Sequence, residues 1–155
     1  MLFRPATLSD LEAVASWIGS SQDCELWAGG RVKYPIDLGS LPEAILFERT
    51  NAFSLSEGEV LAAFGQLVRK NAERAMLGRI IVCPALRGEG YGERFVGLLL
   101  GKARADGLER VGLYVDNANA PAIALYAKTG FRNAALPADQ PEWPGARYME
   151  VGIGD

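Results

Sequence analysis

The chain has 155 residues, a formal net charge of −3, 49% apolar residues and 23% charged residues. This length and composition predict one globular domain over residues 1–155 that buries its own core. The negative net charge argues against a nucleic-acid partner, because proteins that bind nucleic acids normally carry an excess of basic residues. No apolar run reaches membrane-spanning length and no signal-like pattern opens the sequence, so we expect a cytoplasmic protein without a membrane partner.

The absence of histidine limits the chemistry of the protein. It excludes a Ser-His-Asp triad, a Cys-His dyad and a His-ligated zinc, and we expect no metal site. Cys24 and Cys83 are too few and too far apart in sequence for a disulfide framework, which indicates a reducing compartment. Cys83 ends an apolar strand pattern, and its expected role is that of a small core residue rather than a nucleophile.

The first half of the chain predicts strands and short helices. Thr7 or Ser9 is expected to cap the first helix, and residues 20–42 follow no regular pattern. The expected elements are a strand over 2–6, a helix over 10–18, a helix over about 42–49, and strands over 52–56, 60–68 and 76–83. The last three strands follow one another closely, so they predict an antiparallel meander.

The second half alternates between helices and strands. The expected elements are a helix over about 90–105, a strand over about 110–115, a helix from Asn119 to about Lys128, a strand after Phe131 and a last strand over about 146–153. Because the strand over 110–115 lies between two helices, it should join the sheet by a parallel crossover. The expected fold is therefore α/β (α+β), with a mixed central sheet of about six to seven strands flanked by about four helices.

A glycine-rich turn separates the strand over 76–83 from the helix that follows it. Ile80–Val82 is β-branched and strand-forming, and Pro84 should end the strand. A cation and three glycines come next: Arg87, Gly88, Gly90 and Gly92. Free N–H groups and the positive end of the helix dipole make such a turn an anion site. A glycine-rich turn without a ligand is the alternative.

Two common phosphate-binding patterns do not match this turn. A P-loop requires Gly-Lys followed by Ser or Thr, whereas Ala103 follows the Gly-Lys pair at 101–102. A dinucleotide fingerprint requires a third glycine where the sequence has Glu93 or Phe95. The pattern that fits is R-x-x-G-x-G, from Arg87 to Gly92.

A second motif follows the strand over 110–115. The segment from Val115 to Phe131 matches V-x-x-x-N-x-x-A-I-x-L-Y-x-x-x-G-F at every fixed position. With the R-x-x-G-x-G turn before it, this half of the chain resembles the GNAT superfamily of N-acetyltransferases. The resemblance implies a GNAT-like fold in which two neighbouring strands splay apart and form a cleft for acetyl-CoA. It also implies acetyl transfer to the primary amine of a small molecule or of a peptide or protein N-terminus.

The resemblance assigns roles to individual residues. The positions expected to bind acetyl-CoA are Ile80, Ile81, Val82, Arg87, Gly88, Glu89, Gly90, Tyr91, Gly92, Glu93 and Asn119. The Val82 N–H is the expected donor to the thioester carbonyl, and Tyr126 is the expected proton donor to the thiolate. Packing on a helix and simple N-capping are the alternatives for Tyr126 and Asn119.

Several points stay open at this level. In place of the glutamate that some members of the family use as general base, the sequence has Tyr114, and Glu25, Asp116 or a water chain could serve instead. Trp27 and Tyr34 either cover the core or line the acceptor pocket. The acceptor itself is not identified, and both a monomer and a homodimer are compatible with the sequence. A non-catalytic acyl-CoA-binding module and a binder of another phosphate ligand are the competing functions.

Overall fold

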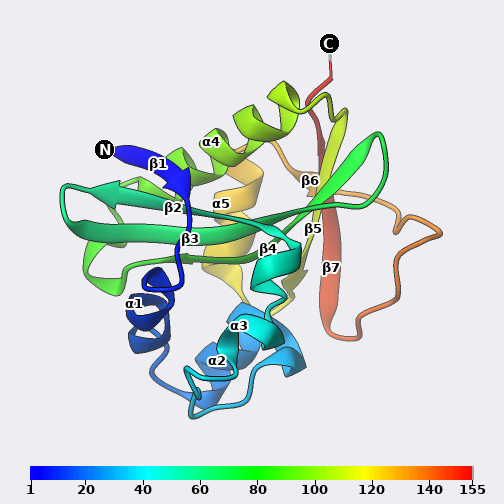
Figure 1. Cartoon of the computed structure of the whole chain (residues 1–155). Coiled ribbons are helices and arrows are strands. Elements are labelled where there is room, and N and C mark those ends of the chain that lie inside the picture. Colours follow the sequence, from blue (N-terminus) through cyan, green and yellow to red (C-terminus); the bar gives the residue numbers. More distant parts are fainter. Residues whose placement is uncertain (155) are drawn as a thin grey trace.

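The computed structural model describes residues 1–154, in which seven strands form one sheet in the order β1-β2-β3-β4-β5-β7-β6 (Figure 1). The strands are β1 (Leu2–Pro5), β2 (Asn51–Glu57), β3 (Val60–Arg69), β4 (Arg74–Val82), β5 (Arg110–Asp116), β6 (Arg132–Asn133) and β7 (Ala146–Gly152). The α-helices are α1 (Asp10–Ser16), α2 (Ser21–Ala28), α3 (Leu41–Ala44), α4 (Tyr91–Ala105) and α5 (Ala120–Lys128). Short 3₁₀ helices cover Gly29–Arg31, Phe47–Arg49 and Pro84–Leu86.

The sheet is mixed, as the sequence predicts. Strands β1 to β4 pair antiparallel in chain order, and β7 pairs antiparallel with both β5 and β6. Strands β4 and β5 pair parallel, and α4 makes the crossover between them. The predicted fold class is therefore confirmed, with one α-helix more than the four expected.

Each face of the sheet is covered by its own set of helices. Phe53 and Leu55 on β2 belong to the core beneath α4 and α5, whereas Ala52 and Phe64 belong to the core beneath α1, α2 and α3. Side chains alternate between the two faces because successive residues of a strand point to opposite sides. Figure 1 shows α1, α2 and α3 gathered below the sheet, with α4 above it and α5 behind it.

The expectation of an irregular segment over residues 20–42 was wrong for its first third. Ser21–Ala28 forms α2, whose N-cap Ser20 accepts a hydrogen bond from the Asp23 N–H at 3.1 Å. Gly29 ends the helix with φ +61°. The helix buries Cys24, Trp27 and Ala28, which have the i, i+3, i+4 spacing of one helical face, so this short pattern and the N-cap Ser20 were the signals that could have predicted it.

Two further helix predictions need correction. Neither Thr7 nor Ser9 caps α1 with its side chain; the Thr7 N–H instead donates to the Asp10 carboxylate at 2.9 Å. The single helix predicted over about 42–49 is two short pieces, α3 and the 3₁₀ helix at Phe47–Arg49, because Leu46 adopts a left-handed conformation with φ +54°. Within residues 1–154, no helix is both long and apolar enough to cross a membrane.

Candidate functional site

Strands β4 and β5 diverge shortly after they meet. Among the residues that the structure describes, only three pairs join the two strands: Arg74 with Arg110, Ala75 with Val111, and Met76 with Gly112. Strand β4 nevertheless continues to Val82. The expected splay is therefore confirmed, and among residues 1–154 no strand pairs with this edge of β4 beyond Met76.

A β-bulge marks the point where β4 bends away. On β3, Phe64 pairs with Ile81 and Gln66 pairs with Gly78, so β4 carries one residue more than β3 over this stretch. Arg79 lies in the bulge with φ +51°, a left-handed conformation that is costly for a residue with a side chain. The Trp27 indole N–H donates to the Arg79 carbonyl oxygen at 3.0 Å.

The backbone beyond the bulge presents one N–H group to the open edge. Cys83 donates its N–H to the Ala62 carbonyl of the β3 side at 2.8 Å. Because successive N–H groups of a strand point to opposite edges, the Val82 N–H points to the other edge, where β5 has diverged. The Val82 N–H is therefore available as a hydrogen-bond donor to a ligand that binds between β4 and β5.

A cavity of about 580 Å³, which we call the first cavity, occupies this splay. Its lining includes nearly all of the predicted site residues: Ile80, Ile81, Val82, Arg87, Gly88, Gly90, Tyr91, Gly92, Glu93, Asn119 and Tyr126. Glu89, which was also predicted, is exposed and is not part of the lining. The structure thus brings together residues from β4, the glycine turn, α4 and α5.

The glycine turn has the geometry of an anion site. Gly88 and Gly90 have φ of +82° and +86°, and a Cβ atom at either would have no heavy atom within 4 Å. Gly90 is the N-cap of α4, and no side chain there accepts a hydrogen bond from the first N–H groups of the helix. Within residues 1–154, the N–H groups of residues 88–93 make no backbone hydrogen bond outside the helix itself. Open space and free donors fit a phosphate group.

Gly92 has a different structural role from Gly88 and Gly90. A Cβ atom there would lie 3.2 Å from Leu125 and 3.4 Å from Val82. The missing side chain lets the first turn of α4 approach α5 and β4 closely, and all three residues line the first cavity.

Tyr126 lies on α5 and is 8% exposed. Burial raises the pKa of its phenol well above the ordinary value of 10, so the phenol stays protonated at physiological pH. Phe131 packs edge-to-face against its ring at 5.7 Å. In the described part of the chain the hydroxyl has no hydrogen-bond partner, which leaves its proton available to a ligand.

Asn119 is the N-cap of α5, as one reading of the sequence proposed. Its Oδ1 accepts a hydrogen bond from the Ala122 N–H at 3.3 Å. This bond uses the carbonyl oxygen of the side chain, and its amide group is a separate donor. Asn119 can therefore cap the helix and donate to a ligand in the first cavity.

The sequence model of the acetyltransferase (GNAT) family matches residues 16–131. The chain belongs to the GNAT family of acetyltransferases. A mycothiol acetyltransferase of Corynebacterium glutamicum is 30% identical over 122 residues, which is 77% of this chain and 41% of that protein. This GNAT chain thus spans about two fifths of the length of the curated relatives that it matches.

Solved GNAT structures have the same fold over almost the whole chain. The ribosomal-protein-S18-alanine N-acetyltransferase of Escherichia coli is 25% identical with a TM-score of 0.71, and covers 99% of this chain and 94% of its own. The spermidine N-acetyltransferase of Vibrio cholerae in complex with CoA and spermine is 18% identical with a TM-score of 0.75, and covers 98% of this chain and 95% of its own. The latter supports the fold alone.

A second cavity of about 330 Å³ adjoins the first in this GNAT protein. Leu26 and Trp27 line both cavities. On β4 the first cavity is lined from Ile80 onward, and the second is lined up to Arg79. The two cavities therefore meet at the bulge, beside the C-terminal part of α2.

Charged residues from distant parts of the chain line the second cavity. They are Glu25, Arg31, Lys70, Arg79 and Asp116. Sequence reasoning named Glu25 and Asp116 but missed the three cations. Arg79 could have been noticed as an ionisable residue inside an otherwise buried strand. Trp27 is buried in the core beneath α1, α2 and α3 and also lines both cavities, whereas Tyr34 is exposed and lines neither.

The segment before β7 closes one side of the second cavity. The Tyr114 hydroxyl donates to the Pro141 carbonyl oxygen at 2.6 Å, and Trp143 packs on the Tyr114 ring at 5.3 Å. Tyr114, at the position where some GNAT members have a glutamate base, is thus used to hold this loop. Within residues 1–154, no group of three or more His, Cys, Asp and Glu side chains is placed to bind a metal ion.

Proposed function

We propose that this protein is an acetyl-CoA-dependent N-acetyltransferase that acts on the primary amine of a small molecule or of a peptide or protein N-terminus. The observation that carries the proposal is the meeting of two cavities at the β4 bulge. One has the anion-binding turn and the buried phenol of Tyr126, and the other has charged residues suited to a polar acceptor. Two substrates in adjacent cavities can react directly.

The first cavity fits acetyl-CoA by its donors. The free N–H groups of residues 88–93 would hold the pyrophosphate, since positive φ at Gly88 and Gly90 turns the backbone toward open space. The Arg87 guanidinium donates through Nε to the Val82 carbonyl oxygen at 3.3 Å, which keeps a positive charge at the rim. Ile80–Val82 and Asn119 would hold the pantetheine arm.

Bound acetyl-CoA supplies an activated acyl group. In this proposal the Val82 N–H donates to the acyl carbonyl oxygen and stabilises the negative charge that grows there. Tyr126 keeps its proton because burial raises its pKa, and it gives that proton to the leaving sulfur. The cavity walls hold the amine against the acyl carbon, which contributes by orientation.

The second cavity receives the amine. Glu25 and Asp116 line it, and their negative charge favours the entry of a protonated amine. The Asp116 carboxylate also accepts a hydrogen bond from the Ala118 N–H at 2.8 Å, which fixes its position at the end of β5. Either carboxylate can accept the proton that the amine must lose before attack.

Two measurements test the proposal in sequence. Thermal unfolding is followed with acetyl-CoA and, separately, with ADP, and we expect stabilisation by acetyl-CoA at concentrations where ADP has little effect. A panel of amino acids, polyamines, aminoglycosides and peptides is then scored for CoA release. Binding of acetyl-CoA without turnover of any amine would favour the non-catalytic acyl-CoA module instead.

We further propose that residues 1–155 form a single acetyltransferase domain that works in the cytoplasm. The family match and the solved GNAT structures, which align over almost the whole chain, support the first point. Two free cysteines, Cys24 and Cys83, support the second, because thiols persist in reducing compartments.

A further inference from the structure

Arg79 has an unusual environment for an arginine within a strand. Its Nε donates to the Gln66 side-chain oxygen, a neutral partner. Gln66 is itself fixed, since its amide nitrogen donates to the Ile45 carbonyl oxygen at 2.8 Å and to the Thr50 hydroxyl at 2.6 Å. Among the ion pairs of residues 1–154, none involves Arg79. A half-buried charge therefore faces the second cavity without a counter-ion.

Two further cations line the same cavity. Arg31 and Lys70 share the lining with Arg79, and we call these three residues the cationic wall. Burial, and after it the charge of Arg31, lowers the pKa of Arg79 to about 10, so the guanidinium is still cationic at neutral pH. Arg31 and Lys70 are exposed, whereas Arg79 is half-buried, so Arg79 is the member of the cationic wall that gains most from an anionic ligand.

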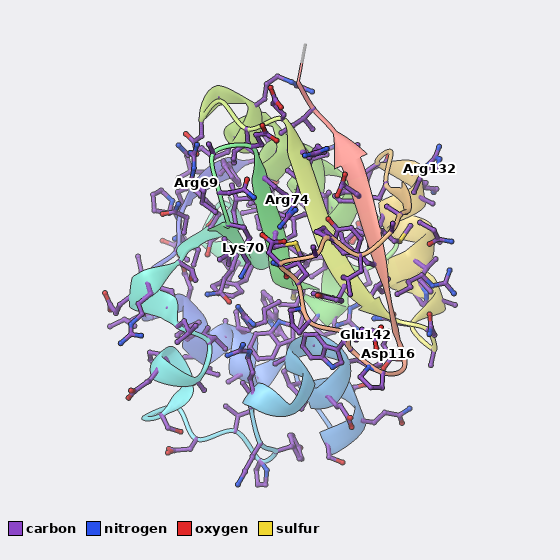
Figure 2. The ribbon with its side chains drawn as sticks, turned by 90° about the vertical axis from the view of Figure 1, so that its right-hand side faces the viewer. Arg69, Lys70, Arg74, Asp116, Arg132 and Glu142 are labelled. Carbon is purple, nitrogen blue, oxygen red and sulfur yellow. The ribbon has the colours of Figure 1, made fainter. Side chains whose placement is uncertain are left out.

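Two acidic residues, Glu25 and Asp116, line the second cavity together with the cationic wall. Glu25 lies on α2 directly before Leu26 and Trp27, which are shared with the first cavity. Figure 2 looks onto this side of the molecule and shows Lys70 above, beside β4, and Asp116 below, near Glu142. The lining of the second cavity thus carries both positive and negative side chains, as a ligand with both charges requires.

The backbone gives a second reason to look for a function at Arg79. Its left-handed φ of +51° is adopted most easily by glycine and asparagine. An arginine at this position costs conformational energy that a smaller residue would not, and such costs concentrate at functional sites.

We propose that the acceptor is an amine that also carries an oxyanion, of which a carboxylate is the simplest, and that the Arg79 guanidinium binds this oxyanion. Arg31 and Lys70 add to the attraction, while the amine lies toward the junction at Trp27. The proposal rests on the proposed acetyl transfer and narrows its substrate class to amino acids and to peptides with an acidic group near the N-terminus.

The test uses acceptor pairs that differ in one charge. Alanine, methionine and phenylalanine are each compared with the corresponding amide by CoA release, and the same is done for dipeptides with a free or an amidated C-terminus. Comparing turnover of the dipeptides with turnover of the free amino acids shows which of the two classes the enzyme prefers. We expect kcat/KM for the better free acids to exceed that of their amides at least about tenfold, because a hydrogen bond between a guanidinium and a carboxylate is stronger than one to a neutral amide.

Three variants locate the effect. Arg79→Asn keeps a residue that tolerates the left-handed backbone and removes the charge, and we expect it to lower kcat/KM for the acid at least about tenfold more than kcat/KM for the amide, which abolishes the preference for the acid. Arg79→Lys keeps the charge but not the two-pronged geometry, and should retain part of the preference. Lys33→Asn removes an exposed cation that lines neither cavity and should change nothing. Circular dichroism confirms that each variant is folded.

Two results would overturn the proposal: equal or faster turnover of the amides by the wild type, or an unchanged acid preference in Arg79→Asn. If no amine is acetylated, the proposed activity fails, and calorimetry then tests Arg79 separately. Binding of a free amino acid to the wild type but not to Arg79→Asn would support an anion site at Arg79, while the proposed acetyl transfer would still be rejected. Absence of such binding would reject both.

Discussion

The indole N–H of Trp27 donates to the carbonyl oxygen of Arg79 at 3.0 Å. This bond joins α2 to the β4 bulge at the place where the two cavities meet, and it satisfies a carbonyl that the bulge removes from the sheet ladder. Trp27 on α2 and Arg79 on β4 are 52 residues apart in sequence. The geometry of the site therefore depends on a contact between two distant segments.

Replacing Trp27 with Phe should loosen the bulge without emptying the core. The Phe ring keeps much of the packing, whereas the Arg79 carbonyl oxygen loses its donor, which costs about 1–3 kcal/mol. We expect urea unfolding to show a loss of this size and steady-state kinetics to show a raised KM for the acceptor. Unchanged stability together with unchanged KM would mean that this bond does not shape the site.

Replacing Tyr126 with Phe tests the proton donor. The variant keeps the edge-to-face contact with Phe131 but removes the hydroxyl that burial keeps protonated. At saturating acetyl-CoA we expect kcat to fall at least about tenfold, with little change in the affinity for acetyl-CoA measured by calorimetry. Tyr34→Phe removes an exposed hydroxyl outside both cavities and serves as the control. Full turnover by Tyr126→Phe would reject the assignment.

Replacing Gly90 with Val tests the anion-binding turn. A branched side chain would enter the open space beside the free N–H groups, so we expect acetyl-CoA binding to weaken by at least about a hundredfold. Part of any effect comes from backbone strain, because φ is +86° at this position. Gly107→Val introduces similar strain at φ +82°, also with no atom within 4 Å of the Cβ position, but outside the cavities. Calorimetric titration should show normal binding by the Gly107 variant, and equal loss in both would point to strain alone.

The lowered pKa of the Asp10 carboxyl predicts how the stability of the protein depends on pH. Burial alone would raise the pKa of its carboxyl, but hydrogen bonds from Arg4, the Thr7 N–H and Ser54, with the charge of Arg4, outweigh burial and lower the pKa to about 2. A carboxyl with a lowered pKa stabilises the fold above its ordinary pKa near 4, and this contribution is lost as the pH falls toward 2. We expect it to amount to about 2 kcal/mol.

Urea unfolding of the wild type and of Asp10→Asn at pH 5.5 and at pH 2.5 measures this contribution. The wild type should exceed the variant clearly at pH 5.5, and the difference should shrink at pH 2.5 as the wild-type carboxyl begins to take up its proton. An equal difference at both values would show that the ionised carboxylate does not stabilise the fold.

The parts of the site that sequence predicted well are those where backbone chemistry determines the residue type. Gly88 and Gly90 need positive φ, and Asn119 and Pro121 start a helix, so these positions are recognisable without a structure. The strand, turn and helix around them followed from β-branched and apolar periods. The local pattern of the first cavity was therefore visible in the sequence.

The second cavity was not visible because its walls come from segments that are distant in sequence. Glu25, Lys70 and Asp116 lie on α2, beyond the end of β3 and at the end of β5. Helix α2 buries three residues over only two turns, which is a short pattern to recognise, and the bulge at Arg79 depends on pairing with β3. Such features depend on tertiary contacts rather than on local propensity.

A crystal structure of the protein with acetyl-CoA tests the central claim most directly. We predict that the pyrophosphate lies against the N–H groups of residues 88–93, that the Tyr126 hydroxyl lies within hydrogen-bonding distance of the sulfur, and that the acetyl group points past Trp27 into the second cavity. A ligand bound elsewhere, or a Tyr126 hydroxyl turned away from the sulfur, would contradict the account.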